Sequence, residues 1–113
     1  MERIMYIENK GNENHIGISR IGRVKFSKTK KTIYYKDKTF ETLSGRGFKS
    51  NYYDTKTGEN YWISGCKKRG NDTLYPGIIE IDDDVREEYW INIRNMPEKI
   101  NVTKMKTTGK YTK

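Results

Sequence analysis

The stretch NYWISGCKKRG, residues 60–70, gathers the residue types that could do chemistry in this chain. It contains the single cysteine, Cys66, directly after a strand-like run that holds Tyr61 and Trp62. Three consecutive cations follow the cysteine: Lys67, Lys68 and Arg69. Positive charge beside a thiol favours the thiolate, which is the nucleophilic form. The same cations, beside two aromatic rings, could instead bind an anionic partner.

The sequence does not place the residues that a catalytic thiol would need beside Cys66. Nucleophilic catalysis needs a base and an orienting group beside the cysteine, and the only histidine, His15, falls in a polar segment far from Cys66 in the sequence. One Cys and one His cannot form a structural zinc site, and the acids of EIDDD (80–84) lack the glycine of a calcium loop. The sequence therefore predicts no catalytic residue, no metal and no cofactor, and it favours a function other than catalysis.

The glycine-rich segment SGRGFK (44–49) offers a second anion site. Glycines let backbone N–H groups turn toward a phosphate, and Arg46 and Lys49 supply positive charge. The segment precedes a strand rather than a helix, so it is not a nucleotide-binding P-loop. It predicts either a contact to a phosphate backbone or a bent loop with a solvated arginine.

Cations and aromatic residues alternate along the predicted strands. Between Arg20 and Lys38 the chain has eight cations and one acid. In GRVKFS, a regular strand turns Arg23 and Lys25 to one face and the apolar residues between them to the other. One face of this strand is then cationic while the other fills the core.

Three pairs of adjacent aromatic residues repeat this device: Tyr34/Tyr35, Tyr52/Tyr53 and Tyr61/Trp62. Neighbouring residues of a strand point to opposite faces, so one member of each pair should lie at the surface. We expect these to be Tyr35, Tyr53 and Trp62. Exposed aromatic rings among cations are typical of proteins that stack unpaired bases. The alternative is a crowded aromatic core surrounded by solvated lysines.

These patterns predict a small basic nucleic-acid-binding module for DNA or RNA, with single strands favoured. Residues 67–69 then form a cationic lip rather than activating Cys66. The predicted nucleic-acid-binding residues are Arg23, Lys25, Tyr35, Arg46, Lys49, Tyr53, Trp62, Lys67, Lys68 and Arg69. The alternative is a protein-interaction or adaptor module that recognises an acidic protein partner.

The elements that must position these residues are mostly strands. Alternation of apolar and polar residues predicts strands at 3–7, 16–27, 32–35, 39–43, 48–54, 60–65 and 77–82. The phase of the second strand slips at Gly22, which suggests a bulge or a bend.

The period changes after residue 82. Residues 83–95 predict one helix, with acids in its first turn and with Val85, Tyr89 and Ile93 on one apolar stripe. From Lys99 onward the chain has five lysines and no acid. We therefore predict a single β-barrel-plus-helix domain over residues 1–98 and a basic flexible tail over residues 99–113.

Short strands joined by hairpins tend to close on themselves and hide their edges. The expected fold is mainly β: a small antiparallel SH3-like or OB-like barrel or roll of five to six strands, capped by one C-terminal helix.

The composition of the chain predicts the kind of partner and the cellular compartment of this domain. The chain has 113 residues and a net charge of +8, which favours anionic partners. It has no apolar run long enough to span a bilayer and no signal peptide at its start. A single cysteine makes no internal disulfide. These features predict a cytoplasmic protein without membrane insertion.

Three stretches resemble a family of small bacterial proteins of unknown function: RIGRVKFSKTKKTIYY (20–35), GFKSNYYDTKTGENYWISGCKK (47–68) and IDDDVREEYW (81–90). Some members of that family carry the name 1-deoxy-D-xylulose-5-phosphate synthase. Enzymes of that name use thiamine diphosphate and need a Gly-Asp-Gly type metal motif, which this sequence does not contain. The resemblance therefore implies a compact module and gives no mechanism.

Overall fold

A closed antiparallel barrel forms the centre of the computed structural model, which describes residues 1–10, 19–43, 50–73 and 77–107. Its six strands are β1 (Glu2–Asn9), β2 (Ser19–Phe26), β3 (Thr32–Tyr35), β4 (Lys38–Thr42), β5 (Tyr52–Asp54) and β6 (Asn60–Gly65). Each strand pairs with the next, and β1 pairs with both β2 and β6, which closes the barrel. The mainly β fold and the six-stranded antiparallel barrel predicted from the sequence are confirmed.

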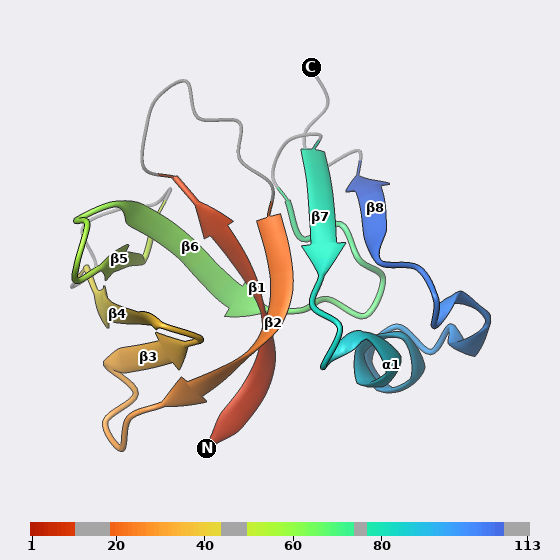
Figure 1. Cartoon of the computed structure of the whole chain (residues 1–113), viewed down its shortest axis with the longest axis horizontal. Coiled ribbons are helices and arrows are strands. Elements are labelled where there is room, and N and C mark those ends of the chain that lie inside the picture. Colours follow the sequence, from red (N-terminus) through yellow and green to blue (C-terminus); the bar gives the residue numbers. More distant parts are fainter. Residues whose placement is uncertain (11–18, 44–49, 74–76, 108–113) are drawn as a thin grey trace.

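Two further strands and one short helix lie beside the barrel wall. Strand β7 (Gly77–Ile81) pairs in parallel with β2, and β8 (Lys104–Thr107) pairs antiparallel with β7. Figure 1 shows β7, β8 and the helix on one side of β1 and β2, with β3, β4 and β5 on the other. Helix α1 (Arg86–Glu88) continues into a π-helical turn, Tyr89–Ile93, and a 3-10 turn follows at Pro97–Lys99. No helix of the described part of the chain is long and apolar enough to cross a membrane.

Strand β1 is buried on both faces, and this divides the core into two clusters. Met5 and Ile7 point into the barrel, where they pack with Val24, Ile33, Tyr35, Phe40, Tyr61 and Ile63. Ile4 and Tyr6 point outward and pack with Ile21, Ile79, Ile81, Val85, Tyr89 and Trp90. A strand that buries both faces has a continuous apolar run, which explains the IMYI at its centre. The helical segment thus packs against the outer face of the barrel, at β1.

Gly22 is the point where β2 changes partners. The residues before it, Ser19–Ile21, pair with β7, whereas Lys25 and Phe26 pair with β3. A Cβ atom at Gly22 would lie 2.5 Å from a ring carbon of Tyr35 and 2.6 Å from Oδ2 of Asp82. The β1–β2 register runs unbroken through Gly22, so the suggested bulge is absent. The apparent phase slip arises because Ile21 is buried in the outer cluster and Val24 inside the barrel.

The predicted tail needs correction. Residues 104–107 form β8, whose Met105 lies opposite Ile79 and packs against the outer cluster. Trp90 supports the segment before it, because its indole N–H donates to the carbonyl of Val102 at 3.0 Å. The ordered chain thus continues past the predicted boundary at residue 98, and the expectation of a flexible tail is wrong for residues 99–107. Residues 108–113 lie outside the described part.

We expect Gly22→Ala to destabilise the protein by about 1–3 kcal/mol, because the added methyl group has no room beside Tyr35 and Asp82. Urea unfolding followed by circular dichroism measures this loss. Gly65→Ala is the matched control, since its Cβ would meet no atom closer than 3.5 Å. Equal midpoints for Gly22→Ala and the parent would contradict the proposed crowding.

We expect Tyr89→Ala to lower the free energy of unfolding by about 3–5 kcal/mol, since this side chain is fully buried in the outer cluster. Ile91 lies in the same turn but is 40% exposed, so Ile91→Ala should change stability by less than about 0.5 kcal/mol. Ile93, predicted to be buried, is only partly buried, and truncating it should cost less than truncating Tyr89. Equal unfolding midpoints for the Tyr89 and Ile91 variants would show that the helix is not docked.

Candidate functional site

The β2–β3 hairpin displays cations beside an aromatic ring on the outer surface of the barrel. Register places Lys25 directly opposite Tyr34, and directly opposed side chains share one face of a sheet with Cβ atoms about 5 Å apart. Both are exposed, with Tyr34 at 45%. An ammonium group and a tyrosine ring are therefore offered together to solvent.

An ordered turn adds three exposed lysines, Lys28, Lys30 and Lys31. The N–H of Ser27 donates to the carbonyl of Thr32 at 3.0 Å, and the N–H of Thr32 donates back to Oγ of Ser27 at 3.1 Å. Lys30 takes a left-handed conformation, with φ of 62°, and its N–H donates to the carbonyl of Ser27 at 3.0 Å. We call Lys25, Lys28, Lys30, Lys31 and Tyr34 the basic hairpin.

None of the four lysines of the basic hairpin forms an ion pair within the described part of the chain. Arg23 differs. It faces outward as predicted, but its guanidinium lies 3.0 Å from the Glu88 carboxylate, and this hydrogen bond raises the pKa of Arg23. Arg23 thus joins β2 to the helix, whereas Lys25 lies opposite Glu2 in the register and forms no ion pair among the described residues.

The aromatic pairs divide between core and surface, but one choice was wrong. Tyr35 is only 5% exposed and points into the barrel with Ile33, so Tyr34 is the surface member of its pair. Ile33, two positions before Tyr35, points into the barrel, and side chains two residues apart in a strand share a face. In the third pair Tyr61 is buried and Trp62 is half-buried at the surface, as predicted.

The second pair is less clearly divided. Tyr52 and Tyr53 are both half-buried. Tyr52 packs against the cluster inside the barrel, so Tyr53 takes the outer face of β5.

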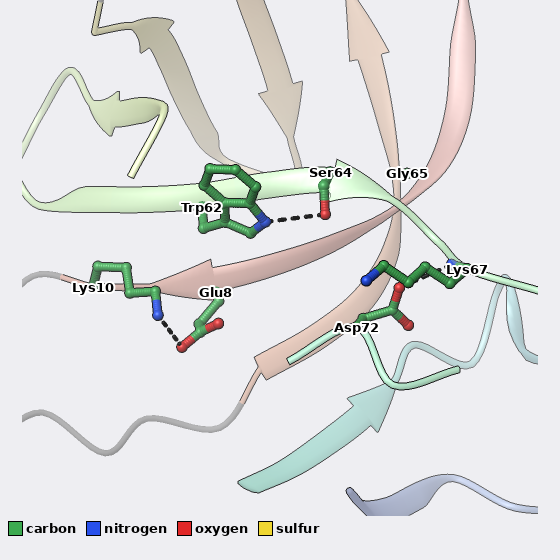
Figure 2. A pocket seen from close by; sticks show the side chains of 7 residues that line it. All are labelled: Glu8, Lys10, Trp62, Ser64, Gly65, Lys67 and Asp72. Atoms are coloured by element: carbon green, nitrogen blue, oxygen red, sulfur yellow. Dashed lines mark hydrogen bonds and ion pairs between the residues drawn. The ribbon is translucent and has the colours of Figure 1, made fainter. Parts of the chain in front are cut away.

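A pocket of about 240 Å³ lies between the outer faces of β1 and β6 and the loop that follows β6 (Figure 2). Its lining residues are Glu8, Lys10, Trp62, Ser64, Gly65, Lys67 and Asp72. Trp62 lies opposite Glu8 in the β1–β6 register, and its indole N–H donates to Oγ of Ser64 at 3.2 Å. Figure 2 shows Lys67 reaching from the loop toward the pocket.

Hydrogen bonds hold the polar groups of the pocket in place. Glu8 accepts the Tyr6 hydroxyl at 2.6 Å and pairs with the Lys10 ammonium at 2.9 Å. The backbone N–H of Lys67 donates to Oδ1 of Asp72 at 2.8 Å. Asp72 is only 7% exposed, and burial raises the pKa of its carboxyl group. Its Oδ2 has no hydrogen-bond partner among the described residues.

Sequence reasoning found Trp62 and Lys67 but missed the other polar residues of the pocket. The sequence signal for the position of Asp72 was the Gly70–Asn71 pair, since glycine and asparagine are the residue types that most readily take positive φ. Both do so here, at 74° and 64°. Such a pair is typical of a tight turn that folds the chain back on itself. It returns Asp72 to the backbone of Lys67.

The predicted site residues gather at two places. Lys25 pairs with Glu2 and Trp62 pairs with Glu8, and six residues along a strand correspond to about 20 Å. The basic hairpin and the pocket thus lie toward opposite ends of β1. Lys68 and Arg69 are exposed in the loop beside the pocket. The predicted Arg46 and Lys49 lie outside the described residues.

The Cys66 thiol is not activated by its cationic neighbours. Burial raises its pKa to about 12, and the thiol donates to the carbonyl of Ile4 at 3.7 Å. It packs against the outer cluster as a small apolar group. In the described ranges, no group of three or more His, Cys, Asp and Glu residues could hold a metal ion.

Comparison of the chain with protein-family models, with curated proteins and with solved structures gives no significant match. The site is therefore interpreted from its own geometry, and the family resemblance of the sequence stays a prediction.

We expect Cys66 to react slowly with iodoacetamide at neutral pH in the folded protein and rapidly in urea, because the folded-state thiol is protonated and packed. Mass spectrometry of the carbamidomethylated protein measures both rates. Cys66→Ala should retain full partner binding. Rapid labelling of the native protein, or loss of binding in a stably folded Cys66→Ala variant, would show that the thiol is functional.

Proposed function

We propose that this protein binds single-stranded nucleic acid, DNA or RNA, through the outer surface of its barrel, with the basic hairpin as its main contact. The observation that carries the proposal is the register of β2 and β3, which sets the exposed Tyr34 ring opposite Lys25. A base can stack on such a ring while the adjacent phosphates approach the ammonium groups.

The electrostatics of the hairpin support this proposal. Residues 25–36 contain five lysines and no acid, and hydrogen bonds fix the backbone of the turn from which three of these lysines project. A turn with a fixed backbone loses less conformational freedom on binding than a mobile loop. The net charge of +8 also accelerates encounters with a polyanion.

An acidic protein partner is the alternative, and salt dependence distinguishes the two. Each phosphate contact to a single strand releases counterions and lowers the logarithm of affinity by about 0.7 per decade of salt. A protein partner bound mainly through aromatic contacts has no such steep dependence. Strong binding of acidic proteins without affinity for oligonucleotides at low salt would favour the alternative.

We expect the combined variant Lys28→Glu, Lys30→Glu and Lys31→Glu to weaken oligonucleotide binding at all sequences tested. It should also reduce the salt slope by about 2, as the loss of three phosphate contacts requires. Fluorescence anisotropy of a labelled single strand between about 50 and 200 mM salt measures both effects.

A matched pair of single variants separates local contact from net charge. Lys28→Glu and Lys56→Glu change the total charge equally, and both residues are exposed, but Lys56 lies in the β5–β6 turn. Lys28→Glu should weaken binding more than Lys56→Glu. Equal effects of the two variants would show that the hairpin is not the contact surface.

A further inference from the structure

We infer that the pocket between β1, β6 and the loop after β6 is a subsite for one unpaired base of the bound strand, with Trp62 as its stacking surface and Lys67 as its phosphate contact. This inference rests on the proposed nucleic-acid binding. It assigns the preference for single strands to the pocket and general phosphate attraction to the basic hairpin.

The size of the pocket suits one flat ring. At about 240 Å³ it is smaller than the cavities of about 300–1,000 Å³ that hold drug-sized ligands. One wall is the indole of Trp62, a half-buried ring that its hydrogen bond to Ser64 holds in one orientation. A ring fixed in this way can stack against a base without first losing rotational freedom.

The pocket lining holds two lysines and two carboxylates, so the excess of positive charge at its mouth comes from the neighbouring Lys68 and Arg69. Glu8 is satisfied by Lys10 and by Tyr6, so its negative charge is already compensated. Asp72 is buried behind Lys67 and fixes the backbone of that residue through the 2.8 Å hydrogen bond. The ammonium of Lys67 is then presented to the pocket (Figure 2), next to the exposed Lys68 and Arg69.

A duplex cannot use this subsite without opening. Bases in a duplex are paired and stacked on both faces, and reaching a pocket requires that one of them be extruded. Phosphates are available in both forms, so contacts to the basic hairpin are the same in kind for single strands and duplexes. Separate roles follow for two surfaces that lie about 20 Å apart along β1.

The test compares a single strand with the duplex of the same sequence, using the parent protein, Trp62→Ala and the hairpin triple variant. Trp62→Ala should weaken single-strand binding by about tenfold to a hundredfold, as expected for one lost stacking contact. It should leave duplex binding within about twofold of the parent, because duplex phosphates do not use the indole. The hairpin triple variant should weaken both.

Two control variants secure this interpretation. Trp62→Phe keeps an aromatic ring and should recover most of the single-strand affinity, whereas a loss caused by misfolding would affect both substrates. Ile91→Ala removes an exposed apolar side chain from the turn after α1, which contributes nothing to the pocket lining, and should not change the preference for single strands.

Two failures are distinguishable. If the hairpin triple variant weakens binding but Trp62→Ala changes neither substrate, or weakens both equally, the base subsite is overturned and the proposed function stands. If the parent binds neither substrate at low salt, the proposed function itself is overturned and the subsite with it.

Discussion

The buried carboxylate of Asp82 is the interaction on which the remaining arrangement depends. It is 4% exposed, and Oδ1 accepts two hydrogen bonds from Arg20, at 2.6 and 2.9 Å. Oδ2 accepts the Tyr35 hydroxyl at 2.5 Å. A buried charge is tolerated only when its hydrogen bonds are satisfied, so β2, β3 and the turn after β7 must meet at this point. Tyr35 is thereby held inward, and because neighbouring strand residues face opposite sides, Tyr34 must face solvent beside Lys25.

The double burial of β1 determines where binding surfaces can form. Its central residues fill the barrel on one side and support the helix on the other, so they present nothing to a partner. Only its ends remain open. Glu2 borders the basic hairpin through Lys25, and Glu8 borders the pocket through Trp62. A strand that organises both cores therefore also keeps the two candidate contact surfaces apart.

Local sequence patterns predicted the bounds of single strands better than they predicted which strands pair with each other. The predicted strands 32–35 and 60–65 have the observed bounds of β3 and β6, since each is bounded by turn residues and alternates cleanly. Strand β8 was missed because KMKT has one apolar residue, and its place depends on pairing with the distant β7. Trp62 and Lys67 could be predicted as surface groups, but their shared pocket could not, because it requires β1 and the return of Asp72. The π-helical turn Tyr89–Ile93 could not be predicted either, because the spacing of its apolar residues is the same as in an ordinary α-helix.

Arginines and the lysines of the basic hairpin differ in their contacts, although Lys10 and Lys38 also pair with carboxylates. Arg20 and Arg23 bond to Asp82 and Glu88, which lie far away in the sequence. Arg86 bonds to Asp83 just before the helix. Arg94 packs over the ring of Trp90 and donates to the Tyr89 hydroxyl. The basic hairpin, in contrast, carries only lysines. Arginine suits fixed, planar contacts, whereas the lysine ammonium is a flexible point charge that approaches a phosphate from many directions. Phosphate contacts carry no sequence information, so the proposed binding through these lysines should depend little on base sequence.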